Sequence, residues 1–234
     1  MSLPTLYQFD YQKFIRVLLL IAGILLTCHL GNMLAGNPSW QLERLFNLDL
    51  EGNLPTWFSS TLWLLASFIA YQCFKLVQDK RGKRAWAVIV LGLIGFSIDE
   101  VAKIHESLFS VTAKYVFPKV FEYKIGPMLK ITNWSILASP FLILVVIWLL
   151  LTLKHLLKDS AHAAWLLVVG LSATIVGGWG LELMTNFLNH RSLQWVLETE
   201  VIFEECLEMV GSILIISGLS NHLRILQNRL ESQI

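Results

Sequence analysis

The chain has 234 residues, of which 55% are hydrophobic and only 15% charged, and its net charge is +1. Soluble domains contain about 25% charged residues. The shortage of charge, together with a mean hydropathy of +0.61, excludes a soluble, collagenous or disordered protein and predicts an integral membrane protein. The near-neutral charge indicates no nucleic-acid partner. The three cysteines (Cys28, Cys73 and Cys206) fall in apolar segments without a CxxC motif, which is typical of small core residues.

Six segments are long and apolar enough to cross a bilayer, whose hydrocarbon core of about 30 Å requires about 20 helical residues. They are residues 14–35, 56–77, 85–106, 133–154, 163–184 and 199–220. We therefore expect residues 1–234 to form a single all-α transmembrane domain, a polytopic bundle of six helices. Two amphipathic stretches, 38–50 and 107–124, are expected to lie at the outer surface.

The orientation of the spans follows from the densest basic run in the chain, residues 78–84, which joins the second and third segments. Short basic loops stay in the cytoplasm, so we expect this loop there. Six spans then place both termini on the cytoplasmic side as well.

Two further patterns concern helix packing and exposure. Gly170, Thr174 and Gly178 repeat at four-residue spacing, which allows a second helix to approach closely. Three histidines on the cytoplasmic side are expected to be surface residues: His155, His162 and His222.

The acidic residues are concentrated on the other side of the predicted membrane. Of the 17 Asp and Glu residues, only four fall on the cytoplasmic side, namely Asp10, Asp79, Asp159 and Glu231. Those within the predicted spans are Asp99, Glu100, Glu106, Glu182, Glu200, Glu204, Glu205 and Glu208. An ionised carboxylate in hydrocarbon is energetically expensive. We therefore expect these groups to face the interior of the bundle and to be neutralised there.

Side chains from three predicted spans fall at similar depths. At 1.5 Å per residue, four of them lie about 18–24 Å from the cytoplasmic ends of their spans, namely His29, Asp99, Glu204 and Glu208. Glu204 and Glu208 are four residues apart and share one helix face. We expect Asp99 or Glu100 to approach the span-six glutamates closely enough to share a ligand or a proton.

Few basic residues are available to neutralise these acids, because only Lys103 and Arg191 lie nearby. Protons or divalent cations are the remaining sources of positive charge. Carboxylates and imidazoles from several helices are typical ligands of Zn, Mn or non-haem Fe, so we expect a divalent metal. Its expected ligands are Asp99, Glu204, Glu208, His29, His105, Glu106 and Glu182. Glu100 and Glu205 are the candidate catalytic residues, for example as a general base.

Some of these residues also have a purely structural interpretation. His29 fits a hydrogen-bonded packing residue, and His105 with Glu106 fits the solvated end of a helix. The paired Glu-x-x-His motifs of di-iron bundles are absent from the sequence. The pattern therefore favours a mononuclear or dinuclear carboxylate/His site in general over a di-iron site.

Three motifs occur in order along the chain: residues 47–60, DE-x4-HE at 99–106, and EE-x2-E at 204–208. Together they resemble a family of uncharacterised bacterial six-span membrane proteins, and the resemblance covers most of the chain. It implies a bacterial inner-membrane location and brings no known activity. On the same basis Asp49 and Glu51, just before the second span, are added as a rim of the site.

Three classes of function fit this pattern. A metal-dependent enzyme would use the cation to polarise a water or a carbonyl, and a site beneath the outer headgroups suits a lipid or amphiphile. A proton- or divalent-cation transporter or channel is the second class, because intramembrane acids often mark ion pathways. The third is a non-catalytic sensor or assembly module with a structural metal. Membrane lipids are the expected partners, and a homo-oligomer is compatible with the sequence.

Overall fold

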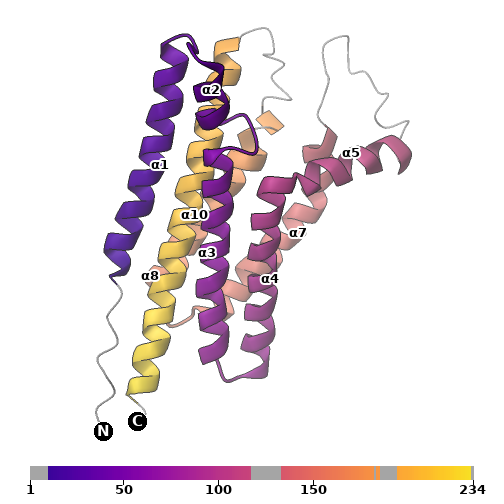
Figure 1. Ribbon diagram of the computed structural model, residues 1–234. Helices are drawn as coiled ribbons and strands as arrows, with labels where there is room; N and C mark the ends of the chain where they lie inside the picture. The colour runs from indigo at the N-terminus through magenta and orange to yellow at the C-terminus, as the bar shows by residue number, and fades with distance from the viewer. Residues whose placement is uncertain (1–9, 117–132, 182, 185–193, 233–234) are drawn as a thin grey trace.

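The computed structural model describes residues 10–116, 133–181, 183–184 and 194–232, and within these ranges the chain is helical with no strand. The all-α class is therefore confirmed. The helices are α1 (Tyr11–Leu34), α2 (Trp40–Phe46), α3 (Leu54–Leu76), α4 (Lys80–Ala102), α5 (Ile104–Val116), α7 (Asn133–Leu156), α8 (Ala161–Ile175), the π-helix η1 (Val176–Leu181) and α10 (Gln194–Glu231). The long helices form a bundle, and α5 lies across one end of it (Figure 1).

Four of the described helical segments are long and apolar enough to cross a membrane: Tyr11–Leu34, Lys80–Ala102, Ala138–Leu156 and Ala161–Leu181. They correspond to the first, third, fourth and fifth predicted spans. The chain is therefore a membrane protein, as its composition predicts.

The helices at the second and sixth predicted spans, α3 and α10, are not among these four. Both are central in the bundle, because α10 packs against α8, α3, η1 and α1, while α3 packs against α4 and α10. A helix that is enclosed by other helices can carry polar groups that would be costly against lipid. The central position of α3 and α10 therefore allows them to carry polar residues.

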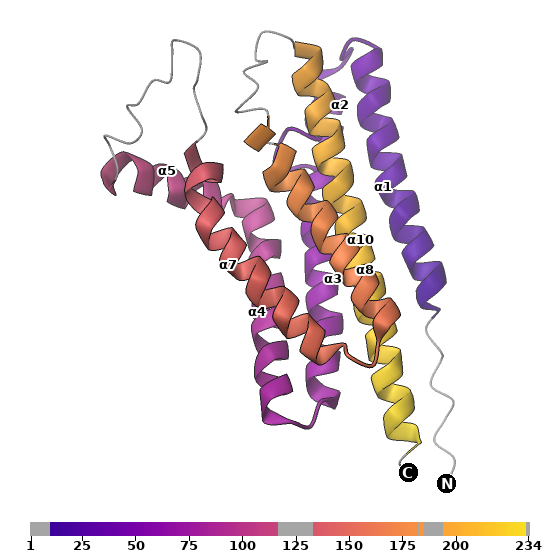
Figure 2. The same cartoon turned by 180° about the vertical axis from the view of Figure 1, so that it is seen from behind.

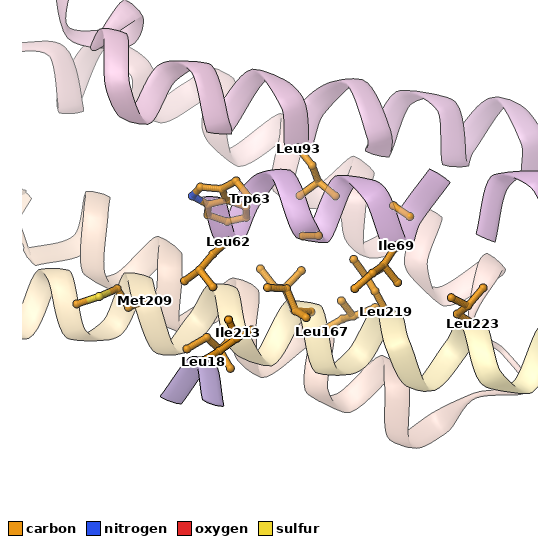
Figure 3. Close-up of a cluster of buried hydrophobic side chains, with 14 of the residues drawn as sticks. Leu18, Leu62, Trp63, Ile69, Leu93, Leu167, Met209, Ile213, Leu219 and Leu223 are labelled. Atoms are coloured by element: carbon orange, nitrogen blue, oxygen red, sulfur yellow. The ribbon is translucent and has the colours of Figure 1, made fainter. Parts of the chain in front are cut away.

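The centre of the bundle is an apolar layer shared by α3, α4, α8 and α10. Leu62 of α3 and Met209 and Ile213 of α10 are almost completely buried, and Leu62 points toward the helix that carries the other two (Figure 3). Leu93 of α4 and Leu167 of α8 extend the same cluster. In a bilayer such a cluster stabilises the fold mainly through van der Waals packing.

Small residues bring α8 and η1 into backbone contact with α10. A Cβ atom added at Gly170 would lie 2.7 Å from the Gly211 carbonyl oxygen, and one added at Gly211 would lie 2.5 Å from Thr174 Oγ1. Farther along, Gly178 lies directly against the Glu208 carboxylate. The predicted packing role of the Gly170, Thr174 and Gly178 stripe is confirmed.

The helix of the third predicted span ends earlier than expected. α4 stops at Ala102, because Lys103 adopts a left-handed conformation with φ 44° and ψ 45°. A separate helix, α5, begins at Ile104 and runs in a different direction (Figure 1). The prediction of one continuous span over 85–106 is therefore wrong at its last four residues.

The expectation of a surface position is wrong for His222. This residue is 4% exposed, stacks on Trp86 with 5.5 Å between the ring centres, and shares a 2.9 Å hydrogen bond with the Ser160 hydroxyl. The contacts tie α10 to α4 and to the start of α8. A buried imidazole is tolerated here because its ring packs on an aromatic surface while Nδ1 has a partner. His155 and His162 are exposed, as expected.

We predict that Gly211→Ala destabilises the protein. The added methyl group would collide with Thr174 and with the Gly170 carbonyl, and such overpacking costs about 1–3 kcal/mol. Gly92→Ala is the matched control, because an added Cβ there meets nothing within 4 Å, and Ala favours a helix over Gly. Thermal unfolding in detergent, followed by circular dichroism, compares the variants. Equal stability of Gly211→Ala and the parent would contradict the close α8–α10 contact.

Candidate functional site

Carboxylates from α4 and α10 gather near the end of the bundle at which α2 and α5 lie. We call this group the acidic cluster; it consists of Asp99, Glu100, Glu204, Glu205 and Glu208. Glu205 interacts electrostatically with Glu100 on α4 and with Glu204 on its own helix. Glu208 interacts with the same two residues and with Glu205. The structure thus brings acids of the third and sixth predicted spans within electrostatic range of one another.

The π-helix η1 shapes one wall of the acidic cluster. The Glu208 carboxylate occupies the space that a side chain at Gly178 would fill. Gly177 packs against the backbone of α10, where an added Cβ would lie 2.9 Å from the Glu204 carbonyl oxygen. Single π-helical turns are rare and are often found at functional sites. The two glycines let α10 come close while leaving room for a carboxylate.

A carboxylate–imidazole pair forms where α4 ends. The turn at Lys103 brings His105 back to Asp99. The His105 backbone N donates to Asp99 Oδ1 at 2.8 Å, and His105 Nδ1 lies 2.5 Å from Asp99 Oδ2. An ionised carboxylate only accepts hydrogen bonds, so an ionised Asp99 requires His105 Nδ1 to be the donor of this contact. Asp99 therefore orients His105, as carboxylates do for histidines in metal sites and catalytic triads.

The segment between α2 and α3 forms a loop beside the acidic cluster that is held in place by side-chain hydrogen bonds. The buried Asn53 side chain donates to the carbonyl oxygens of Asn47 at 2.6 Å and Leu50 at 2.7 Å. From α1, His29 Nδ1 accepts a hydrogen bond of 3.3 Å from the Leu48 backbone N. His29, expected as a metal ligand, thus binds this loop through one ring nitrogen, which agrees with its structural interpretation.

The same loop brings the two predicted rim residues next to the site. Asp49 interacts electrostatically with Glu205. Glu51 forms an ion pair of 2.6 Å with Lys103, and Lys103 in turn interacts with Glu205. One cation is therefore shared between the rim and the acidic cluster. The other expected base, Arg191, falls in a part of the chain that the structure does not describe.

Serines and then apolar side chains close the bundle beneath the acidic cluster. The Ser60 hydroxyl of α3 donates to the Ser97 carbonyl oxygen at 2.7 Å and lies 2.9 Å from the Ser97 hydroxyl. One step farther from the acids, Leu62, Met209 and Ile213 belong to the buried apolar layer. The site is therefore bounded on this side by buried apolar side chains.

The described side chains do not by themselves form the expected metal site. Among them, no group of three His, Cys, Asp or Glu residues is arranged to hold a metal ion. Asp99 is engaged with His105, and Glu204 and Glu208 lie along α10. Two further expected ligands, Glu182 and the side chain of Glu106, lie outside the described residues.

Several residues of the site are not among those that the sequence predicts. Asn53 has a detectable signal, because an Asn two residues before a proline is typical of a helix start, and it caps α3 by accepting from the Thr56 backbone N at 3.1 Å. The Ser60–Ser97 contact and the π-helical turn have no comparable signal. The turn at Lys103 has none either, because left-handed residues are usually Gly or Asn.

A profile of a domain of unknown function (DUF8692) matches residues 14–223. The chain belongs to this family. No curated protein and no solved structure matches the chain. Because the DUF8692 family carries no assigned activity, the function has to be argued from the geometry of the site.

Proposed function

We propose that this DUF8692 chain spans a bacterial inner membrane six times, with the acidic cluster on the outer side. α3 and α10 contain 23 and 38 residues, and about 20 suffice to cross the hydrocarbon. They run alongside the four apolar spans, and α1 begins and α10 ends toward the end of the bundle at which α3 turns into α4 (Figure 2). That turn precedes the basic residues 80–84, which favour the cytoplasm.

Cysteine labelling tests this topology. Lys80 is exposed at the start of α4 and Gln41 is exposed on α2, so each tolerates a cysteine in a variant whose native cysteines are replaced by Ala. We expect a membrane-impermeant maleimide to label Gln41→Cys in intact cells and Lys80→Cys only after permeabilisation. Labelling of Lys80→Cys from outside would contradict the orientation.

We further propose that the acidic cluster is the active site of a metal-dependent enzyme acting on a lipid or another amphiphile. The observation that carries this proposal is the pairing of Asp99, a member of the acidic cluster, with His105. An imidazole held by a carboxylate is a good metal ligand or general base, because its tautomer and direction are set in advance. Glu100 or Glu205 would supply a second acid–base group.

The excess of negative charge supports a bound cation. The acidic cluster holds several carboxylates within electrostatic range, whereas the charge of Lys103 is shared between Glu205 and Glu51. A divalent Zn, Mn or Fe ion would offset the repulsion and polarise a water or a substrate carbonyl. His105 and the glutamates of α10 are the residues that would hold it, with Glu106 and Glu182 as further candidates.

The apolar layer favours an enzyme over a transporter. An ion that left the acidic cluster for the opposite end would have to pass Leu62, Met209 and Ile213, which are almost completely buried. A site that is open only toward one surface suits a substrate that arrives from that leaflet. A second candidate, a proton-linked transporter, is favoured by one observation: the described side chains include no three-ligand metal group, so protons could neutralise the acids.

Glu205→Gln and a strong chelator separate these two functions. If a metal is bound, we expect either treatment to lower metal content and to reduce stability by about 1–2 kcal/mol, or about 2–8 °C in melting temperature. Glu43→Gln on α2, outside the acidic cluster, is the control and should leave both unchanged. Incubation with a bacterial lipid extract, followed by mass spectrometry, should reveal a metal-dependent product that Glu205→Gln does not form.

Neutralisation of the acidic cluster by protons predicts the opposite result. Gln is nearly isosteric with a protonated Glu, so a proton-neutralised cluster predicts that Glu205→Gln keeps or gains stability. Together with a parent protein whose metal content and melting temperature do not respond to chelator, that result would refute the metal enzyme and favour the proton-linked transporter.

A further inference from the structure

At the end of the bundle opposite the acidic cluster, α7 stands apart from α4. α7 packs against α5 and α8, and its apolar segment is the least buried of the four candidate spans. It runs obliquely to the other helices (Figure 2). A groove of about 460 Å³ separates it from α4, and its lining consists of Arg81, Arg84, Ala85, Val88, Trp148, Leu151, Thr152 and His155.

The α4 side of this groove changes from basic to apolar with depth. Arg81 and Arg84 lie in the first turns of the helix, three residues apart, and therefore on neighbouring positions of one face. Ala85 and Val88 follow toward the middle of the bundle. From Arg81 to Val88 the helix rises by about 10 Å.

The α7 side has the same gradient, although the helix runs in the opposite direction. His155 and Thr152 lie at the level of the arginines, near the end of α7. Leu151 and Trp148 lie deeper, with 65% and 41% of their surface exposed. Both walls therefore offer polar groups at the surface and apolar surface below.

The groove is positively charged and contains no carboxylate. None of its lining residues is acidic, and neither Arg81 nor Arg84 forms an ion pair with another described residue. A guanidinium presents a planar set of donors that matches phosphate oxygens. Basic grooves between transmembrane helices at the membrane surface are typical sites for acidic lipid headgroups.

We propose that this groove binds an anionic phospholipid. The phosphate is held by Arg81 and Arg84, and an acyl chain lies along Val88, Leu151 and Trp148. The lipid thereby fills the space that α7 leaves beside α4. The site requires only that this end of the bundle lies at a membrane surface, as the six-span topology implies, and it is independent of any catalytic role of the acidic cluster.

Native mass spectrometry of the full-length protein tests the site, with phosphatidylglycerol and phosphatidylcholine of identical acyl chains as probes. We expect phosphatidylglycerol to bind more tightly, and Arg81→Gln/Arg84→Gln to weaken its binding at least about tenfold, because each basic residue contributes about 1 kcal/mol. Lys154→Gln/Lys158→Gln is the matched control. It removes two exposed charges near the same end of α7 but outside the groove lining, and it should change binding by less than about threefold.

A second variant tests the apolar part without changing the charge. Ala85→Trp places a large side chain inside the groove, so we expect it to displace phosphatidylglycerol while both arginines remain. Equal binding of the two lipids would overturn the proposal, as would equal losses in the arginine and lysine variants. Displacement of the lipid by inorganic phosphate alone would identify a simple anion site instead, and a dimer that forms only without lipid would identify a second copy as the occupant.

Discussion

The arrangement of the site depends on how closely α10 approaches α8 and η1. Gly170 and Gly211 place the two backbones in contact, and no larger residue fits there. Two turns farther along, Gly177 and Gly178 keep the same separation while leaving room for the Glu208 carboxylate. Because α10 is held this deeply in the bundle, the side chains of Glu204, Glu205 and Glu208 are only partly exposed. In the proposed six-span arrangement, a looser helix pair would expose the same acids to hydrocarbon, at a cost of several kcal/mol each.

The second determinant is the break between α4 and α5. One left-handed residue, Lys103, ends the span and sets His105 against Asp99. The same turn places the Lys103 side chain beside Glu51 of the loop before α3. Polar and charged side chains are thereby brought together at the end of the bundle near α2 and α5. The apolar layer around Leu62 separates these side chains from the opposite end of the bundle. This arrangement is the basis of the proposed active site.

The sequence predicts the helical class, the positions of the long helices and the proximity of the acids, because each follows from a strong constraint. A bilayer sets the length of a helix, and a carboxylate must avoid lipid. The finer features depend on local geometry without such a constraint. The residue type at Lys103 does not predict a left-handed turn. The burial of His222 depends on Trp86 from another helix. The pairing of Asp99 with His105 exists only because the helix ends between them.

Cross-linking in the native membrane tests the central claim, that α4 and α10 bring their carboxylates together. Glu100→Cys and Glu205→Cys are combined in a chain whose own cysteines are replaced by Ala. Ile98→Cys with Glu205→Cys is the control pair, because Ile98 is 52% exposed on the surface of α4. We expect a short bifunctional thiol reagent to link positions 100 and 205 and to leave 98 and 205 unlinked. Efficient linking of the control pair, without linking of 100 to 205, would contradict this account.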